Sequence, residues 1–504
     1  MINIVIRMVR RPLGRLILSF LAAGTISLGV APAPGTPEHR SSSAPDEKVD
    51  YHRVRIMLRT TAEGASLRFD NTGWLLTASR KALNGPVLKK GLTLRELWVA
   101  PDSPGHSVSI LAHYALKPEA AGQSLSCLLR QLGRGTSLLR VYKYENRQYV
   151  LLQEEHLESA GSKQVKLDFS QLKDQGVLSG RVFRVSEQKK IWAFYYPWYT
   201  DRWDTGILSD KPGVGYYSSA DPKIIKYHVE KALWSKIDGF ISSWWGPGDY
   251  TDMNLKALLD IAKTKSFRVM INFETLTQDS RGQTVPLDPD TIVTWLSYAI
   301  SRYAEHPAYL NIEGKPVIVL WASNSLPVST WETIFADLKA KGKEGHFIAM
   351  SYGSWPPLDS LDKAAGWHYY NILQVIQKEE EVPTVLAQVY LRNKRCVRFY
   401  PLFASPPSPR IWCATAQPGY DDHLIPGRTT PILKRKNGDL YKQTLQAALD
   451  SDPDWIFITS WNEWWEHTYI EPSKKYGSLY LQITKQYAEQ WKSAEKAMRT
   501  STWF

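Results

Sequence analysis

The chain has 504 residues, a formal net charge of +12 at pH 7 and three cysteines. Its length predicts two or three domains, and its 43% hydrophobic and 22% charged residues are typical of globular proteins, which excludes disordered, collagen-like and polytopic membrane proteins. Three cysteines also exclude a scaffold built on disulfides. The 20 tryptophans are unusually many. They fit either a tryptophan-rich core or stacking platforms for flat ligands such as sugar rings.

The first 33 residues have the pattern of a secretory signal peptide. Arginines precede an apolar run, Leu16–Ala31, and small residues follow at Ala31 and Ala33. The run is short for a bilayer span, which favours a cleaved signal over a retained anchor. Residues 34–50 are rich in Ser, Pro and charge and predict a flexible linker. We therefore expect a secreted or cell-surface protein that contacts the membrane only if the leader stays uncleaved.

The sequence gives limited information on partners, disulfides and metals. No basic helix carries interleaved aromatics, so we expect no nucleic-acid partner. Cys396 and Cys413 flank a loop and are compatible either with a disulfide or with unpaired buried thiols. No set of His, Asp and Glu has convincing metal-ligand spacing, and we expect neither a metal nor a cofactor. The oligomeric state is left open by the sequence.

Residues 51–186 predict an all-β domain. Short alternating runs are separated by Gly, Asn, Asp and Pro turns, a pattern that favours a β-sandwich. Such a domain is either purely structural or carbohydrate-binding, and Trp74 and Trp98 are its only tryptophans. The runs are Arg53–Leu58, Ser66–Phe69, Ser107–Tyr114, Leu138–Tyr144, Tyr149–Glu154 and Val165–Phe169.

Residues 187–495 predict a (β/α)₈ barrel, followed by a tail at 496–504. Apolar runs alternate with amphipathic stretches such as Pro222–Ser235, Asp252–Thr264 and Asp288–His306. An open doubly wound sheet is the rival, but no Gly-rich phosphate turn and no nucleophile elbow follows a strand. The eight runs are Ile191–Tyr196, Ile237–Ser242, Phe267–Phe273, Pro316–Trp321, His346–Ser351, Gly366–Ile372, Ile411–Ala416 and Trp455–Trp461.

Aromatic and acidic side chains gather where these runs end. The active sites of barrel enzymes lie at the carboxyl ends of the strands, and a sugar cleft needs aromatic faces together with carboxylates. We therefore predict an oligosaccharide or polysaccharide substrate. From their places at the ends of the runs, the predicted substrate-binding residues are Tyr196, Tyr199, Trp244, Trp245, Glu274, His368, Tyr369, Asn462, Trp465 and Glu471.

The last run is followed by a pair of glutamates three residues apart, Glu463 and Glu466. On a helical turn such residues are neighbours, and retaining glycosidases hold two carboxyls about 5–5.5 Å apart. The neighbouring tryptophans would desolvate the pair and raise a carboxyl pKa, as a general acid requires. Alone, this spacing is more often a solvated helix face; its place after the last strand favours catalysis.

Several of these segments together resemble glycoside hydrolase family 99 and its bacterial relatives. The resemblance runs from about residue 190 to residue 490 and is most specific at Thr459–Pro472, where the family typically reads Phe-Asn-Glu-Trp-His-Glu-Gly-Thr-Gln-Ile-Glu. The other segments that carry it are Phe194–Tyr199, Asp221–His228, Asp238–Trp245 and Pro418–Asp422.

The resemblance implies a retaining endo-α-mannosidase that uses no metal. In that family one glutamate draws the proton from the substrate's 2-hydroxyl, which closes a 1,2-anhydro sugar, and the other protonates the leaving oxygen and then activates water. By motif position, Glu463 would assist the 2-hydroxyl and Glu466 would be the acid and then the base. The residues alone do not separate this route from a glycosyl-enzyme intermediate.

This chain departs from the family motif at four positions: Trp461, Trp465, His467 and Tyr469 replace Phe, His, Gly and Gln. Both glutamates are intact. The departures leave open a glycosidase acting on another glycan. Two further alternatives are a secreted carbohydrate-binding protein without turnover and, with less support, a polysaccharide-assembly protein.

Overall fold

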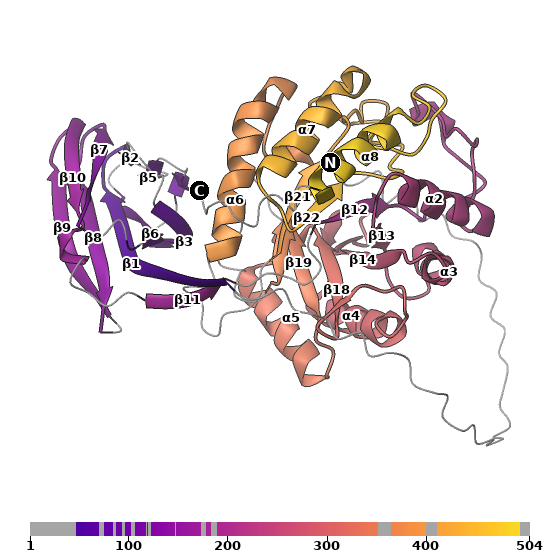
Figure 1. The fold of residues 1–504 in the computed structure, drawn as a ribbon, viewed down its shortest axis with the longest axis horizontal. Coiled ribbons are helices and arrows are strands. Elements are labelled where there is room, and N and C mark those ends of the chain that lie inside the picture. The colour runs from indigo at the N-terminus through magenta and orange to yellow at the C-terminus, as the bar shows by residue number, and fades with distance from the viewer. Residues whose placement is uncertain are drawn as a thin grey trace.

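The computed structural model describes residues 47–69, 75–83, 87–92, 96–101, 106–116, 118, 122–146, 148–172, 178–182, 189–350, 364–399 and 411–493. The predicted signal peptide, most of the predicted linker and the tail lie outside these residues. Within them, no helix is long and apolar enough to cross a membrane. A β-rich region and a barrel lie side by side, with helix α6 (Ala387–Phe399) on the barrel side of their boundary (Figure 1).

The N-terminal region consists of antiparallel strands in two sheets. One sheet has the order β3-β6-β1-β8-β9, with β11 also paired to β1, and the other has the order β10-β7-β2-β5-β4. The strands are β1 (Glu47–Thr60), β2 (Gly64–Phe69), β3 (Leu75–Leu83), β4 (Val87–Leu92), β5 (Glu96–Pro101), β6 (Val108–Leu116), β7 (Ser124–Leu132), β8 (Ser137–Glu145), β9 (Gln148–Leu157), β10 (Gly161–Asp168) and β11 (Leu178–Val182).

Both sheets contribute to one hydrophobic cluster. Ile56 of β1 and Leu129 of β7 belong to different sheets and are fully or almost fully buried in it. The sequence predicted six of the eleven strands; β3, β4, β5, β7 and β11 were missed. Trp98 is half-buried in β5 and Trp74 lies outside the described residues, so a carbohydrate-binding role for this region stays a prediction.

The C-terminal region is an eight-stranded parallel barrel, as predicted. Its order is β14-β13-β12-β22-β21-β20-β19-β18, and a further pairing of β14 with β18 closes it. The strands are β12 (Lys190–Tyr195), β13 (Gly239–Trp244), β14 (Arg268–Glu274), β18 (Lys315–Trp321), β19 (His346–Met350), β20 (Gly366–His368), β21 (Ile411–Ala416) and β22 (Trp455–Ile458). Short pairings outside the barrel involve β15 (Leu276–Gln278), β16 (Thr284–Pro286) and β17 (Asn311–Ile312).

Helices surround the barrel (Figure 1). Three of them begin at an aspartate whose carboxylate accepts a hydrogen bond from the first turn: Asp221, Asp249 and Asp288. Proline at the first position of two of these helices fixes the backbone for entry. Besides α6, the helices are α2 (Pro222–Trp234), α3 (Tyr250–Lys263), α4 (Pro289–Tyr303), α5 (Val328–Ala340), α7 (Asp439–Asp450) and α8 (Leu479–Ser493).

Alternate residues of each barrel strand belong to different cores. In β12, Ile191 and Tyr195 pack toward the helices, whereas Trp192 and Phe194 belong to the cluster inside the barrel. The same alternation continues past the strand ends, so it determines which side chains face the mouth of the barrel. Cys413, inside the barrel, is a buried free thiol. The side chain of Cys396 lies outside the described part of the chain.

We predict that Gly239→Ala destabilises the barrel. A Cβ at Gly239 would lie 2.2 Å from the carbonyl oxygen of Arg268 and 2.5 Å from the ring of Trp192, so strand β13 must shift. We expect a loss of about 1–3 kcal/mol in the free energy of unfolding, measured by urea titration. Gly206→Ala is the control, because its Cβ approaches only the side chain of Asp204, at 3.4 Å. Equal midpoints for both variants would contradict the prediction.

Candidate active site

The predicted glutamate pair lies in the loop that follows β22, inside the mouth of the barrel. Glu463 is 2% exposed; its Oε1 accepts the backbone N–H of Trp465 at 3.0 Å. Its own N–H donates to Ser460 Oγ at 2.8 Å, which closes the turn at the strand end. Glu466 is partly exposed, so of the two carboxyls it has the better access to solvent.

The two carboxyls share a desolvated site. Burial, and then the negative charge of Glu466, raise the pKa of Glu463 well above its usual range. Burial raises the pKa of Glu466 to about 7, and the guanidinium of Arg428 acts in the opposite direction on both groups. The pair therefore holds at least one proton near neutral pH, as an acid–base pair must.

A third carboxyl, Glu274, faces the same space from the end of β14. Its Oε1 accepts hydrogen bonds from Ser243 Oγ at 2.7 Å and Asn272 Nδ2 at 2.8 Å, and Trp245 Nε1 donates to the same Ser243 Oγ at 3.1 Å. Burial raises the pKa of Glu274 to about 8, the two hydrogen bonds lower it and the charge of Glu466 adds to the increase. Glu274 is therefore protonated near neutral pH.

Aromatic side chains form the walls around these carboxyls. The hydroxyl of Tyr196 donates to that of Tyr370, which in turn lies 3.5 Å from Glu466 Oε2. Burial holds the pKa of both tyrosines well above the usual value, so both stay donors. Trp465 stacks on Trp198 with ring centroids 5.4 Å apart and planes at 14°. The cleft thus combines flat apolar faces with neutral hydroxyl donors, as sugar recognition requires.

One guanidinium lies beside the pair. Arg428 NH1 is 3.1 Å from Asp422 Oδ2, and both side chains are buried. The same oxygen also accepts the hydroxyls of Tyr420 and Thr430. Asp422 thus holds the guanidinium of Arg428 near the loop after β22 that contains Glu463 and Glu466, which we call the carboxyl loop. The sequence did not predict Arg428.

The structure places two of the predicted substrate contacts away from the cleft. Trp244 and Tyr369 belong to the core between strands and helices. Trp244 Nε1 donates to Asp252 Oδ1 at 2.7 Å, and the Tyr369 hydroxyl accepts Asn393 Nδ2 at 2.9 Å. Strand alternation turns both outward and turns their neighbours inward. His368 is inside the barrel but fully buried between Phe194 and Phe457, and burial lowers its pKa to about 4. It lies beneath the site.

Three other predicted substrate contacts form hydrogen bonds that stabilise the loop after β22. Both side-chain groups of Asn462 bond the backbone of Tyr196, at 2.8 and 3.0 Å. The Tyr199 hydroxyl donates to Asn462 O and accepts Trp464 N–H. Glu471 is 1% exposed. Its Oε1 pairs with His228 Nε2 at 2.9 Å, and its Oε2 accepts from Tyr217 and Trp464. These side chains hold the loop rather than face the cleft.

The structure brings Tyr196, Trp245, Glu274, Glu463, Trp465 and Glu466 together, and it adds Tyr370 and Arg428. Tyr370 had a usable signal, because inward positions of β20 have even numbers like His368, so residue 370 rather than 369 faces the cleft. Arg428 had none, since it lies in a long loop and reaches the site only through the fold.

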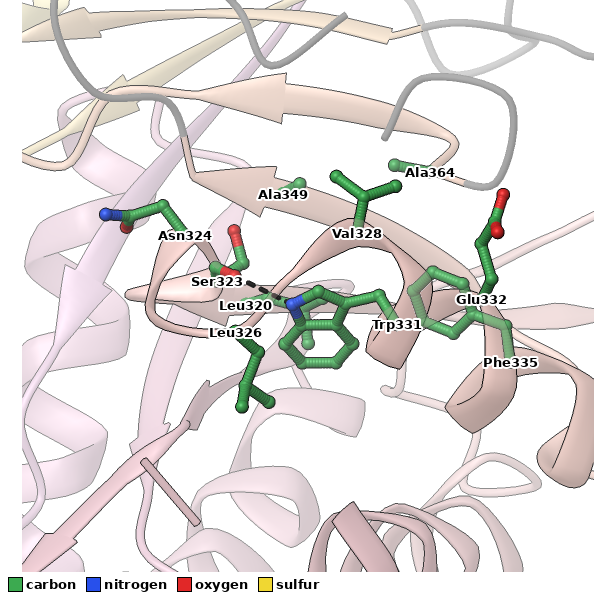
Figure 2. A pocket seen from close by; sticks show the side chains of 10 residues that line it. All are labelled: Leu320, Ser323, Asn324, Leu326, Val328, Trp331, Glu332, Phe335, Ala349 and Ala364. Carbon is green, nitrogen blue, oxygen red and sulfur yellow. Dashed lines mark hydrogen bonds between the residues drawn. The ribbon is translucent and has the colours of Figure 1, made fainter. Parts of the chain in front are cut away.

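A separate hollow lies between α5 and strands β18 and β19 (Figure 2). Its walls are mostly apolar and include Leu320, Leu326 and Phe335. Trp331 closes it and donates from Nε1 to the carbonyl of Ser323 at 2.7 Å. Glu332 is the only carboxylate among its lining residues, so it lacks the acid pair that the barrel mouth contains.

The arrangement supports proton transfer to and from a bound sugar. One carboxyl pair carries a shared proton, a third carboxyl and two tyrosines are neutral donors, and tryptophan faces lie beside them. Within the described ranges, no group of three or more His, Cys, Asp and Glu is placed to hold a metal ion.

Comparison with known proteins agrees with this chemistry. The model of the family described as "Glycosyl hydrolase family 99" matches residues 204–354, and that of "Glycosyltransferase WbsX" matches residues 288–484. The rat glycoprotein endo-alpha-1,2-mannosidase is 25% identical over 369 residues, which cover 60% of this chain and 74% of the rat protein. The human glycoprotein endo-alpha-1,2-mannosidase-like protein is 26% identical over 363 residues, which cover 59% of this chain and 74% of the human protein.

Among solved structures, a GH99 endo-alpha-mannosidase from Bacteroides thetaiotaomicron is 22% identical, with a TM-score of 0.49 and coverage of 61% of this chain and 99% of that one. Barrel, carboxyl pair and sequence matches together define this chain as a glycoside hydrolase, which acts on oligosaccharide substrates. Within that class, the matches support the resemblance to glycoside hydrolase family 99 that the sequence predicted.

We predict that Glu274→Gln makes the protein more stable at neutral pH. In the unfolded chain a glutamate ionises above about 4.5, whereas folded Glu274 keeps its proton to about 8. Between these values the unfolded state binds fewer protons, so wild-type stability falls as pH rises. Glutamine accepts the same two hydrogen bonds without this penalty. The difference between variant and wild type in the free energy of unfolding should increase from pH 5 to pH 8 by up to about 3 kcal/mol. A constant difference would show that Glu274 is not buried as a neutral acid.

Proposed function

We propose that this protein cleaves α-mannosidic or closely related α-linked glycans with retention, using Glu463 and Glu466. The observation that carries the proposal is the pair of neighbouring carboxyls after the last barrel strand, both with pKa values raised by burial. The similarity to endo-alpha-1,2-mannosidases supports the mannoside and the endo action. A glycan of another sugar is the alternative, because the loop around the pair departs from the family motif.

In the proposed mechanism Glu463 and Glu466 carry out different proton transfers. Glu466, partly exposed and with its pKa raised to about 7 by burial, is suited to protonate the leaving oxygen and then to activate water. In the state that carries the pair's proton on Glu466, the deeper Glu463 is a carboxylate. It draws the proton from the substrate's 2-hydroxyl, so that this oxygen attacks the anomeric carbon and closes a 1,2-anhydro sugar; this division of roles follows the family motif. Tyr370 and Arg428 favour the ionised form of Glu466 between the two steps.

We also propose that the chain is exported and that its leader is removed. The support is the arginine-rich, apolar and small-residue pattern of residues 1–33. Export would place the cleft in contact with extracellular polysaccharide, and the antiparallel N-terminal region, with a sandwich-like shared core, would accompany it.

A second candidate is glycosyl transfer during polysaccharide assembly. The WbsX match favours it, because residues 288–484 include the whole carboxyl loop. Incubation with an acceptor oligosaccharide and a nucleotide sugar tests it. A lengthened acceptor and free nucleotide would establish transfer from an activated donor, whereas shortened glycan without a nucleotide requirement would establish hydrolysis.

We predict that Glu463→Gln and Glu466→Gln each lower kcat by about 100- to 10,000-fold, because each removes one proton transfer and keeps the shape of the side chain. Mass spectrometry of products from α-mannans, glucosylated high-mannose glycans and α-glucans is the measurement. Glu230→Gln is the matched control, because its carboxylate lies on the exposed side of helix α2 and pairs with Lys265 at the surface. Unchanged turnover in both glutamine variants would overturn the assignment.

We predict that a substrate without the 2-hydroxyl at the cleaved residue binds but is not hydrolysed. The proposed route needs that oxygen as its nucleophile, whereas a glycosyl-enzyme route attacks with a carboxylate and does not. The 2-deoxy analogue of whichever panel glycan is cleaved should bind within about 10-fold of the parent in calorimetry and release no product. Product release at a comparable rate would exclude the 1,2-anhydro intermediate and leave the glycosidase assignment intact.

A further inference from the structure

His467, the residue after Glu466, bonds the loop after β22 to two other loops. His467 is 5% exposed, and its φ of +53° lies in the left-handed region that glycine favours. Its Nδ1 bonds the backbone carbonyl of Asp421, and its Nε2 lies 3.0 Å from the backbone nitrogen of Ser209. One imidazole thus bridges the loop after β22, the loop after β21 and the loop after β12.

These two bonds fix the protonation state of the ring. The N–H of Ser209 is a donor, so Nε2 must accept with its lone pair. The carbonyl of Asp421 is an acceptor, so Nδ1 must carry the hydrogen. The ring is therefore neutral, with its hydrogen on Nδ1. A second proton on Nε2 would point at the Ser209 N–H, and that bond would be lost.

The backbone beside His467 is held at the same point. The N–H of Asp421 donates to the carbonyl of Glu466 at 3.0 Å, so the two segments are joined by a backbone bond and a side-chain bond. Arg435 donates from Nε and a terminal nitrogen to the carbonyl of His467, at 3.2 and 3.0 Å. The peptide units on both sides of His467, the first of which carries the Glu466 carbonyl, are thus fixed from outside their own loop.

We propose that His467 is a positioning residue for Glu466: its neutral imidazole holds the Glu466 loop against the loops after β12 and β21 and releases the Ser209 side on protonation. The proposal rests on the proposed function only in treating Glu466 as the acid. It does not depend on which glycan is cleaved.

The surroundings of the ring set the direction of its pH response. Burial lowers the pKa of His467 below its usual value, and Arg435 acts in the same direction. The hydrogen bond to Asp421 O and the charges of Asp421 and Asp210 raise it. The ring of Tyr469 is the remaining neighbour, with its centroid 6.5 Å away. The ring is therefore neutral at pH 7 and accepts the Ser209 N–H there. This hydrogen bond is lost as pH falls through the lowered pKa of His467.

Hydrogen exchange of the full chain, followed by mass spectrometry, tests the proposal without a substrate. His467→Gly is the main variant, because glycine adopts the same φ without strain and removes only the side chain. We expect the amide of Ser209, which loses its acceptor, to exchange about 10-fold faster at pH 7. The amide of Asp421 should also exchange faster, because its bond to the Glu466 carbonyl is then no longer supported by the bond between the ring and the Asp421 carbonyl. Added imidazole should restore protection. In the wild type, protection of Ser209, corrected for intrinsic exchange, should decline as pH falls below about 6.5, and in the variant it should not.

His423→Asn is the matched control, since that histidine is exposed and bonds only the side chain of Asp421. Faster exchange at Ser209 with an unchanged Asp421 amide would overturn the proposal, because the ring would then be a local tie. Unchanged exchange at both would overturn it as well. If the glycine variant does not fold, His467→Asn replaces it with the same expectations, since Asn tolerates this φ.

On any glycan that the wild type cleaves, the same variant should lower kcat about 10-fold with KM within about two-fold, because a displaced acid affects the chemical step more than binding. A loss confined to KM would contradict positioning of Glu466. Absence of hydrolysis in the wild type would refute the proposed function and leave the exchange result to decide on His467.

Discussion

The carboxyl loop depends on the buried carboxylate of Glu471. A charge without partners at 1% exposure would cost several kcal/mol, and here three donors, from His228, Tyr217 and Trp464, satisfy both oxygens. These donors come from α2, from the loop after β12 and from the carboxyl loop itself. The two ends of the segment 464–471 are thereby tied to elements that are distant in sequence. Because this anchor is rigid, the residues between its ends can hold two acids in a desolvated position.

The same rigidity explains how repelling carboxyls stay together. Glu463, Glu466 and Glu274 all have pKa values raised by burial, so the folded protein keeps them at a cost in stability near neutral pH. Arg428 offsets part of that cost, and Asp422 in turn fixes Arg428. Buried carboxyls that lower the stability of the fold are typical of acid–base catalysis, because the same burial moves their pKa values toward neutral pH.

The barrel was predictable because its eight apolar runs and Asp-capped helices follow local rules, and the observed strands lie within a few residues of the predicted runs. Antiparallel strands such as β3 (LLTASRKAL) were missed because charged residues interrupt their alternation. Many of the tryptophans belong to the core rather than to stacking platforms for sugars. Seven of the 20, including Trp244, are among the largest fully buried side chains. Which member of a pair such as Trp244 and Trp245 faces the cleft depends on strand orientation. A local pattern does not contain that information, nor the arrival of Arg428 from a distant loop.

Three of the departures from the family motif share a feature of the structure. Trp465 stacks on Trp198, His467 accepts the N–H of Ser209, and the Tyr469 hydroxyl donates to Asp210 Oδ2 at 2.8 Å. All three side chains therefore meet the loop after β12, whereas the hydrogen bonds described above for Glu463 and Glu466 are made to other segments. The altered residues and that loop form one interface, built beside an unaltered acid pair. A change of glycan preference relative to the family would then arise from this interface, because it shapes the wall next to the cleaved bond and leaves the proton chemistry as it is.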